Sequence, residues 1–190
     1  MKTSPQHGRM AGFTVTELVM VMVIVGILTA IGVPSFKYVT VSNRISSEIN
    51  GLLGDMQFAR SQAIKQGLTV TVCSSSNSTT ANPTCNAGIV WNTGWIVFLD
   101  SNGNQQVDPG EQVIRVQPAF NSNDTLTSTV AGYAAATYNR LGYAPTATGN
   151  TINIALHDAS NTSNWIRCLA VTASGSVTTE KYGAGSPACS

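Results

Sequence analysis

Residues 12–36 read GFTVTELVMVMVIVGILTAIGVPSF, and this stretch decides how the chain begins. No charged side chain occurs between Leu18 and Val33. A helix rises about 1.5 Å per residue, so residues 13–36 would extend about 36 Å, enough to cross a hydrocarbon core of about 30 Å. The stretch therefore predicts a transmembrane helix over residues 13–36.

Glu17 is the one ionisable residue inside this predicted helix, a single turn from its start. An ionised carboxylate in hydrocarbon is costly, so its presence indicates a function. Two interpretations are open. Glu17 pairs with a free α-amine at Phe13, which would exist only after cleavage of the chain, or it is an interfacial helix-start glutamate, capped by Thr14 or Thr16.

Residues 1–12, MKTSPQHGRMAG, form a hydrophilic segment ahead of the apolar run. An ordinary secretory signal has its small-residue cleavage site after the apolar core, whereas Ala11-Gly12 comes before it. Cleavage after Gly12 would therefore keep the helix. Because Lys2 and Arg9 precede the helix, the positive-inside rule places this leader in the cytoplasm and the rest of the chain outside.

Composition indicates an extracytoplasmic domain. Charged residues are 10% of the chain, against about 25% in ordinary soluble domains. The net charge of +1 gives no global attraction to nucleic acid. The four cysteines indicate disulfides, since the spacing typical of zinc sites is absent. Of the three pairings that four cysteines allow, we favour Cys73–Cys85 and Cys168–Cys189, because each closes a short loop.

Residues 37–67 are expected to continue as an amphipathic helix that stops at Gly67. The predicted apolar face comprises Ile45, Ile49, Leu52, Leu53, Met56, Ala59 and Ala63. The predicted solvent side carries Arg44, Glu48, Asp55 and Lys65. Gly51 and Gly54 each cost about 1 kcal/mol of helix propensity, so we expect a sheet or a neighbouring subunit to approach them closely.

Residues 68–190 have the short apolar runs and Gly/Asn/Ser/Pro turns of an antiparallel β-rich head. The candidate strands are residues 68–73, 89–91, 95–100, 112–117, 125–131, 136–139, 151–156, 166–172 and 176–181. Asn92-Thr93-Gly94 predicts a tight hairpin between the second and third of them. The predicted fold class is α+β, with a long N-terminal transmembrane helix packed on the head.

The sequence carries no enzyme constellation. His157 is the only histidine after the leader, and the adjacent Asp158 cannot easily reach the geometry of a catalytic relay. No Walker loop, HExxH motif or dinucleotide fingerprint is present. We therefore predict a protein without catalytic residues or a cofactor.

The loop over residues 100–111, DSNGNQQVDPGE, imitates a calcium loop. Its oxygen-bearing candidates are Asp100, Asn102, Asn104, Asp108 and Glu111. Gln105 stands where a calcium loop needs Gly, and no helix pair flanks the loop. We favour a polar turn over a metal site.

The motif at residues 12–18, GFTVTEL, resembles the type IV prepilin cleavage motif. The resemblance implies a prepilin peptidase that cuts after Gly12 and methylates the new Phe13 amine. It also implies that Glu17 recruits the subunit into a helical filament by pairing with a neighbour's N-terminus. Pro34 falls where pilins commonly kink this helix, since proline removes a backbone hydrogen bond.

Further stretches are similar to the GspH/FimT/FimU group of minor pilins and pseudopilins. They are LLGDMQFARSQAIK at residues 52–65, the strand ending at Cys73, WNTGWIVF at residues 91–98 and the loop and strand over residues 100–115. The resemblance implies a subunit that first resides in the bacterial inner membrane with its head in the periplasm. It then joins a filament with other minor and major pilins or pseudopilins.

The resemblance leaves three roles open. The first is a minor pilin that primes or caps a type IV pilus, the second is the H-type pseudopilin of type II secretion, and the third is a DNA-uptake minor pilin. The resemblance to FimT-like minor pilins implies that a C-terminal Gly-Arg-x-Arg element would carry DNA binding. The corresponding residues here are 175–178, GSVT, which lack both arginines. Arg140, Arg167 and Lys181 would form at most a small basic patch, so DNA is not the favoured partner.

Overall fold

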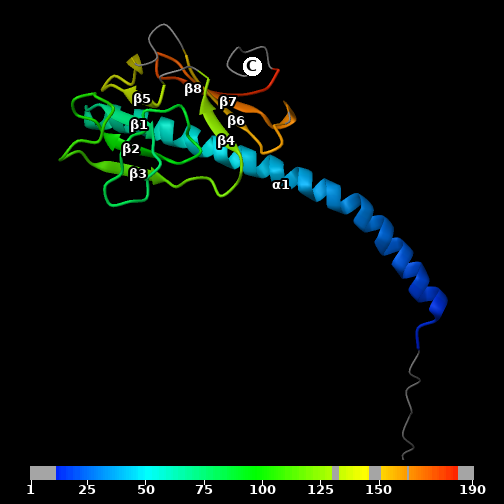
Figure 1. Ribbon diagram of the computed structural model, residues 1–190. Helices are drawn as coiled ribbons and strands as arrows, with labels where there is room; N and C mark the ends of the chain where they lie inside the picture. The colour runs from blue at the N-terminus through cyan, green and yellow to red at the C-terminus, as the bar shows by residue number, and fades with distance from the viewer. Residues whose placement is uncertain (1–11, 130–132, 146–150, 162, 184–190) are drawn as a thin grey trace, which may run out of the picture. The chain divides into compact units, whose positions relative to one another are not determined.

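The computed structural model describes residues 12–129, 133–145, 151–161 and 163–183. The chain divides into two compact units, Met1–Thr40 and Val41–Ser190. One long helix, α1 (Val15–Gln66), begins in the first unit and ends in the second (Figure 1). The two predicted helical segments are therefore parts of one continuous helix.

In the first unit, α1 is an apolar helix whose side chains are exposed. Its most apolar 18-residue window has a mean hydropathy of 2.4 and is 0% buried, so its length and composition suffice to cross a membrane. Hydroxyls on this helix bond to its own backbone, since Thr29 and Thr40 donate at 2.9 Å to the carbonyls of Val25 and Phe36. The helix continues through Pro34 without a break, and the predicted kink there stays a prediction.

The second unit carries the strands. They are β1 (Val70–Ser74), β2 (Trp95–Leu99), β3 (Val113–Gln117), β4 (Thr125–Ser128), β5 (Ala135–Tyr138), β6 (Ile152–His157), β7 (Arg167–Val171) and β8 (Val177–Lys181), with a short 3-10 helix, η2 (Ser163–Trp165). They form two 4-stranded sheets, in the orders β3-β2-β1-β5 and β4-β6-β7-β8. All the pairings within the sheets are antiparallel, as predicted.

The second half of α1 and both sheets share one hydrophobic core. The predicted apolar face of the helix is buried there through Ile45, Ile49, Leu52, Met56, Ala59 and Ala63, while Leu53 is partly buried. Val70, Val72 and Val97 come to this core from the first sheet, and Leu126, Ile154 and Leu169 come from the second. Helix and sheets therefore bury their apolar sides together, which is the driving force for this arrangement.

The predicted strand at residues 89–91 and its hairpin are wrong. Gly94 N–H does bond to the carbonyl of Trp91 at 3.1 Å, so the predicted turn exists. Val90, however, makes an isolated bridge to Thr127 of β4, whereas β2 pairs with β1 and β3. The turn thus carries the chain from the edge of one sheet into the other, instead of joining two neighbouring strands.

Two expectations for α1 also change. Asp55, predicted on the solvent side, is only 8% exposed because it faces two donors from the sheet. A Cβ added to Gly51 or Gly54 would meet no atom within 4 Å, so the sheets of this chain do not require either glycine.

Gly67 has a φ of +67° directly after the last helical residue, consistent with its predicted role as the helix stop.

Candidate functional site

The start of α1 is capped by Thr14. Its Oγ1 accepts a hydrogen bond from the backbone N–H of Glu17 at 3.3 Å, and its carbonyl accepts one from Leu18 at 3.2 Å. A threonine cap followed three residues later by Glu is the capping-box sequence. The backbone N–H of Glu17 is therefore satisfied by Thr14.

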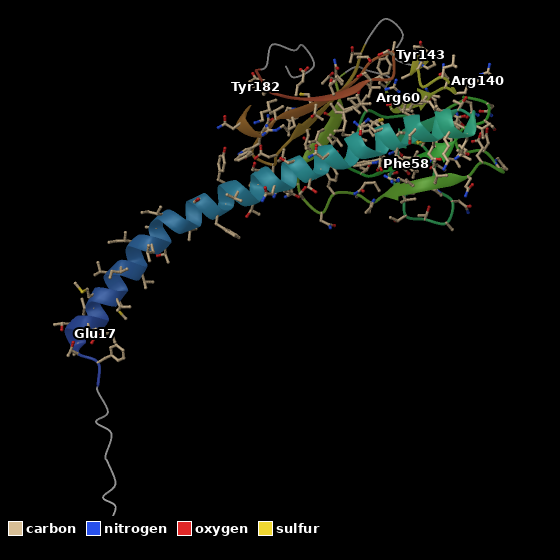
Figure 2. All side chains as sticks on the ribbon, turned by 180° about the vertical axis from the view of Figure 1, so that it is seen from behind. Glu17, Phe58, Arg60, Arg140, Tyr143 and Tyr182 are labelled. Atoms are coloured by element: carbon tan, nitrogen blue, oxygen red, sulfur yellow. A yellow bond between two sulfur atoms is a disulfide. The ribbon has the colours of Figure 1, made fainter. Side chains whose placement is uncertain are left out.

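The Glu17 carboxylate is exposed among the apolar side chains at the N-terminal end of α1 (Figure 2). It makes no ion pair or hydrogen bond with any residue in the described ranges. Phe13, whose amine was the predicted partner, is 83% exposed. The first helical turn, in which Glu17 lies, is a favourable place for an acidic side chain, because the helix N-terminus carries a partial positive charge.

In the second unit, a partly buried network joins α1 to the first sheet. The Asp55 carboxylate accepts a hydrogen bond from the Trp95 indole N–H at 2.8 Å and from Arg115 Nη1 at 2.6 Å. The Arg115 guanidinium also lies 3.8 Å from the ring centroid of Phe58, in a cation–π contact. Because both donors come from far along the chain, no local pattern in the sequence marked Asp55 as a buried residue.

Arg60 joins α1 to two loops near the end of the helix. Its Nε donates to the carbonyl of Gly142 at 3.0 Å, and its Nη2 donates to the carbonyl of Ser174 at 3.3 Å. Figure 2 shows Arg60 close to Tyr143 and Arg140 at this end of the helix. The side chain therefore fixes both loops against α1.

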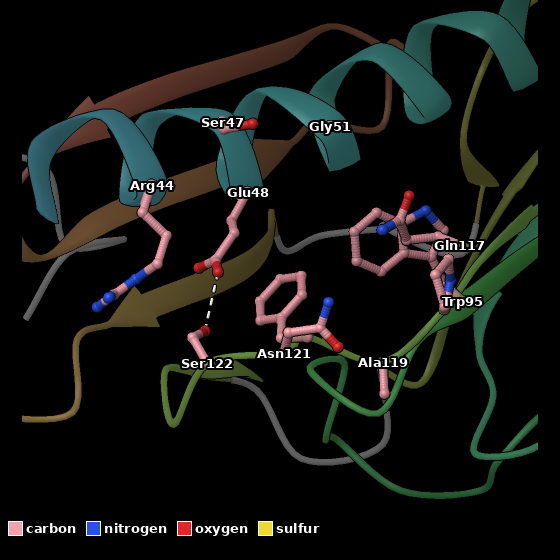
Figure 3. A pocket seen from close by; sticks show the side chains of 11 residues that line it. Arg44, Ser47, Glu48, Gly51, Trp95, Gln117, Ala119, Asn121 and Ser122 are labelled. Carbon is pink, nitrogen blue, oxygen red and sulfur yellow. Dashed lines mark hydrogen bonds between the residues drawn. The ribbon is translucent and has the colours of Figure 1, made fainter. Parts of the chain in front are cut away.

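A groove of about 620 Å³ lies between α1 and the segment that follows β3. Its lining includes Arg44, Ser47, Glu48 and Gly51 of α1, Trp95 of β2 and residues 117–122 (Figure 3). The rings of Trp95 and Phe120 meet edge to face, with centroids 6.0 Å apart. The groove thus combines an aromatic part with a charged wall.

Arg44 and Glu48 are the charged residues that line this wall. Arg44 makes a two-pronged ion pair with Asp124, at 2.6 Å and 2.9 Å. Glu48 Oε1 accepts a hydrogen bond from the Ser122 hydroxyl at 2.9 Å. Its Oε2 is buried, and among the described residues the Asp124 carboxylate is the neighbour that acts on Glu48. Burial raises the pKa of Glu48 from 4.5 to about 6, and the charge of Asp124 adds to the rise.

The structure contains the Cys73–Cys85 disulfide, as predicted. Cys168 is also disulfide-bonded. Its predicted partner, Cys189, lies outside the described residues, so that pairing stays a prediction.

The candidate calcium loop closes on its own hydrogen bonds. The buried Asp100 carboxylate accepts from the backbone N–H groups of Gly103, Asn104 and Gln105, at 2.7 to 3.1 Å, and from Thr71 Oγ1 at 2.7 Å. The amides of Asn102 and Asn104 donate to Asp108, and Glu111 accepts from Ser101. Hydrogen-bond donors surround Asp100, as in a polar turn, and the expectation that this loop holds no metal stays a prediction.

The basic residues weighed for DNA binding do not form one patch. Arg167 and Lys181 are opposite each other on β7 and β8. Arg140 lies near the end of α1, away from Tyr182, which follows Lys181 (Figure 2). Arg167 is also engaged, because its Nη1 donates to the backbone carbonyls of Asn164 and Ile166.

Comparisons with known proteins agree with this architecture. Two crystal structures of the Pseudomonas aeruginosa type IV minor pilin FimU, in space groups P21 and P65, share the fold at 15% identity. The first match covers 73% of this chain and 89% of that chain with a TM-score of 0.56, and the second covers 73% and 91% with a TM-score of 0.50. A search of curated proteins found no significant match. The family model described as Type II transport protein GspH matches residues 48–175, more than half of the chain. The chain belongs to the GspH family of pilin-like proteins.

Proposed function

We propose that this chain is a structural subunit of a pilin-type filament, and that it enters the filament through the helix of residues 13–40. The observation that carries the proposal is Glu17, a carboxylate with no partner in the described residues on an exposed apolar helix. In a hydrocarbon or protein interior such a charge is penalised unless it is paired. Membership of a pilin-like family supports the same conclusion.

The partner that fits Glu17 best is the α-amine of Phe13 on a neighbouring subunit. That amine becomes available once a prepilin peptidase of the inner membrane cuts after Gly12, and it keeps a positive charge if the peptidase methylates it. Lipid tails are as apolar as the helix, so packing between helices gains little from hydrophobicity. A single amine–carboxylate pair can therefore set the register of the helix in the filament.

Within this class we favour a minor pilin that primes or caps a type IV pilus. The fold shared with a protein titled a type IV minor pilin supports this choice. The second candidate is the H-type pseudopilin of type II secretion, which the description of the matching family model favours. In both, the helix first resides in the inner membrane and the head lies in the periplasm.

The proposal is tested by replacing Glu17 with Ala and, as a matched control on the same exposed helical turn, Thr16 with Ala. We expect both variants to be cut after Gly12, as shown by mass spectrometry of the mature N-terminus. Only Glu17→Ala should fail to appear in sheared filaments. Normal incorporation of Glu17→Ala would refute the pairing role.

Deletion of the gene distinguishes a subunit of a type IV pilus from a pseudopilin of type II secretion. Loss of surface pili with normal export of secreted enzymes would identify a type IV pilus subunit. Loss of enzyme export with normal pili would identify the secretion pseudopilin instead.

A further inference from the structure

Glu48 and Asp124 are two acidic side chains that meet between α1 and the segment leading into β4. Glu48 Oε2 is buried, and Asp124 is only 1% exposed. Burial, and after it the charge of Asp124 and a side-chain hydrogen bond with it, raise the pKa of Glu48. Ionised carboxylates can only accept hydrogen bonds, so a bond between these two requires a proton on one of them.

The surroundings of the pair favour Glu48 as the member that holds the proton. Arg44 Nε donates to Asp124 Oδ2 at 2.6 Å, and Arg44 Nη2 donates to Oδ1 at 2.9 Å. The backbone N–H of Ala159 also donates to Asp124 Oδ1, at 3.1 Å. These three bonds favour the ionised form of Asp124. Glu48 accepts one bond among the described residues, from the Ser122 hydroxyl to Oε1, which leaves Oε2 as the place for a proton (Figure 3).

We propose that Glu48 donates a shared proton to Asp124 at acidic pH, and that this carboxyl pair holds residues 118–124 against α1 and lets them open as the pH becomes neutral. Loss of the proton leaves two carboxylates facing each other, and like charges at close range repel. The Ser122 hydroxyl contacts both partners, because it donates to Glu48 and accepts from the backbone N–H of Asp124 at 3.4 Å. The device lies in the second unit alone, so it can hold or fail independently of the role proposed for Glu17.

The other charged groups near the pair do not replace this proton. Arg44 is the cation beside it, and Asp158 is a third acidic residue that acts on Arg44. His157, at the end of β6, is hydrogen-bonded through Nδ1 to Asn161 Oδ1 at 2.7 Å, away from the pair. One cation therefore serves three acidic side chains, and a proton on Glu48 reduces their repulsion.

Phe120 shows whether residues 118–124 are closed. Its ring meets that of Trp95 edge to face, with centroids 6.0 Å apart, and its backbone N–H donates to the carbonyl of Asn92 at 3.0 Å. Opening of the segment breaks both contacts. The Phe120 amide then exchanges its hydrogen with water, which makes this exchange a measure of the open population.

The pKa of Glu48 sets the size of the effect. It is about 6 in the closed state, and an open segment returns it to the ordinary value of 4.5. Linkage between protonation and opening then increases the opening equilibrium constant about eightfold between pH 5 and pH 7.5. The closed form is favoured on the acidic side because it holds the proton more tightly.

The test is amide hydrogen exchange, followed by NMR, on the ¹⁵N,¹³C-labelled full-length chain in detergent micelles at pH 5 and pH 7.5. After correction for the intrinsic exchange rate, the Phe120 amide should exchange about eightfold faster at pH 7.5. The ¹³C signal of the Glu48 carboxyl should titrate near pH 6 in the same sample. Titration of that signal near 4.5, or corrected exchange that does not change with pH, would overturn the proposal.

Two substitutions at Glu48 separate the shared proton from other effects of pH. Glu48→Gln keeps a donor toward Asp124 and cannot ionise, so exchange at Phe120 should be slow and equal at both pH values. Glu48→Ala removes the bond, so exchange should be fast and equal at both. Glu111→Gln is the matched control, because Glu111 also accepts from a serine hydroxyl, and it should keep the wild-type pH dependence. A wild-type pH dependence in Glu48→Gln would place the proton elsewhere and refute the role of the pair.

Discussion

Gly175 offers the sharpest test of how the head is held together. Its φ of +77° lies in the left-handed region, and a Cβ there would overlap the carbonyl oxygen of Gly142. That carbonyl accepts the hydrogen bond from Arg60 Nε at 3.0 Å. An alanine at position 175 must therefore strain the backbone and also push apart the two loops that Arg60 joins.

The expected cost of Gly175→Ala has two parts. A left-handed non-glycine residue costs about 1–2 kcal/mol. Loss of a hydrogen bond from a charged group costs about 1.5–3 kcal/mol more. Together they predict a loss of about 2.5–5 kcal/mol in the free energy of unfolding.

Gly67→Ala is the matched control, since Gly67 has a φ of +67° with nothing within 4 Å of an added Cβ. It should lose only the backbone part, about 1–2 kcal/mol. Gly142→Ala should fall between them, because its Cβ would meet the Ile64 side chain at 2.8 Å, which can move more easily than backbone.

Urea unfolding followed by tryptophan fluorescence measures these differences, because Trp91 and Trp95 are both buried in the core. With an m-value of about 2 kcal/mol per molar urea, the Gly175→Ala midpoint should lie about 0.75–1.5 M below that of Gly67→Ala. Equal midpoints for these two variants would show that the loops can move apart with no loss in the free energy of unfolding, and would refute the reasoning.

Three further predictions concern stability. Cys73→Ser opens a loop with a sequence separation of 12 and should cost about 3 kcal/mol, measured in urea without reductant and compared with reduced wild type. Asp55→Ala leaves the buried Trp95 N–H without an acceptor and should cost about 2–4 kcal/mol, whereas Asp55→Asn keeps an acceptor and should cost about half as much; equal losses would exclude the hydrogen bond as the cause. Wild-type stability should fall as pH rises from 4.5 to about 6, since the raised pKa of Glu48 makes the folded state hold its proton more tightly. The pKa difference corresponds to about 2 kcal/mol, which solvent screening reduces to about 1 kcal/mol, and Glu48→Gln should lack this pH dependence.

Local patterns predicted most of the fold. The three-to-four spacing of Ile45, Leu52, Met56 and Ala63 located the buried face of α1 because a helix repeats every 3.6 residues. Most strands were also found near their positions, since each is a short apolar run between turn residues. The N-terminal motif indicated the family before any contact was known.

Contacts between distant residues were not predictable in this way. Nothing near residues 89–91 indicates that Val90 bridges to Thr127 and not to β2. Asp55 looked like a solvent-side residue because its partners, Trp95 and Arg115, come from separate strands. The groove was missed for the same reason, since Glu48 meets Ser122 across 74 positions of sequence.

The hydrophobic core of the described residues begins at Ile45, and no buried residue precedes it. The described side chains of residues 13–33 and 35–40 are exposed and do not belong to that core. Under the proposed function, these residues exchange lipid for neighbouring helices while the hydrophobic core of the second unit stays as it is. Under the proposed function, the assembly machinery acts on the first part of α1 while the second part holds the head together.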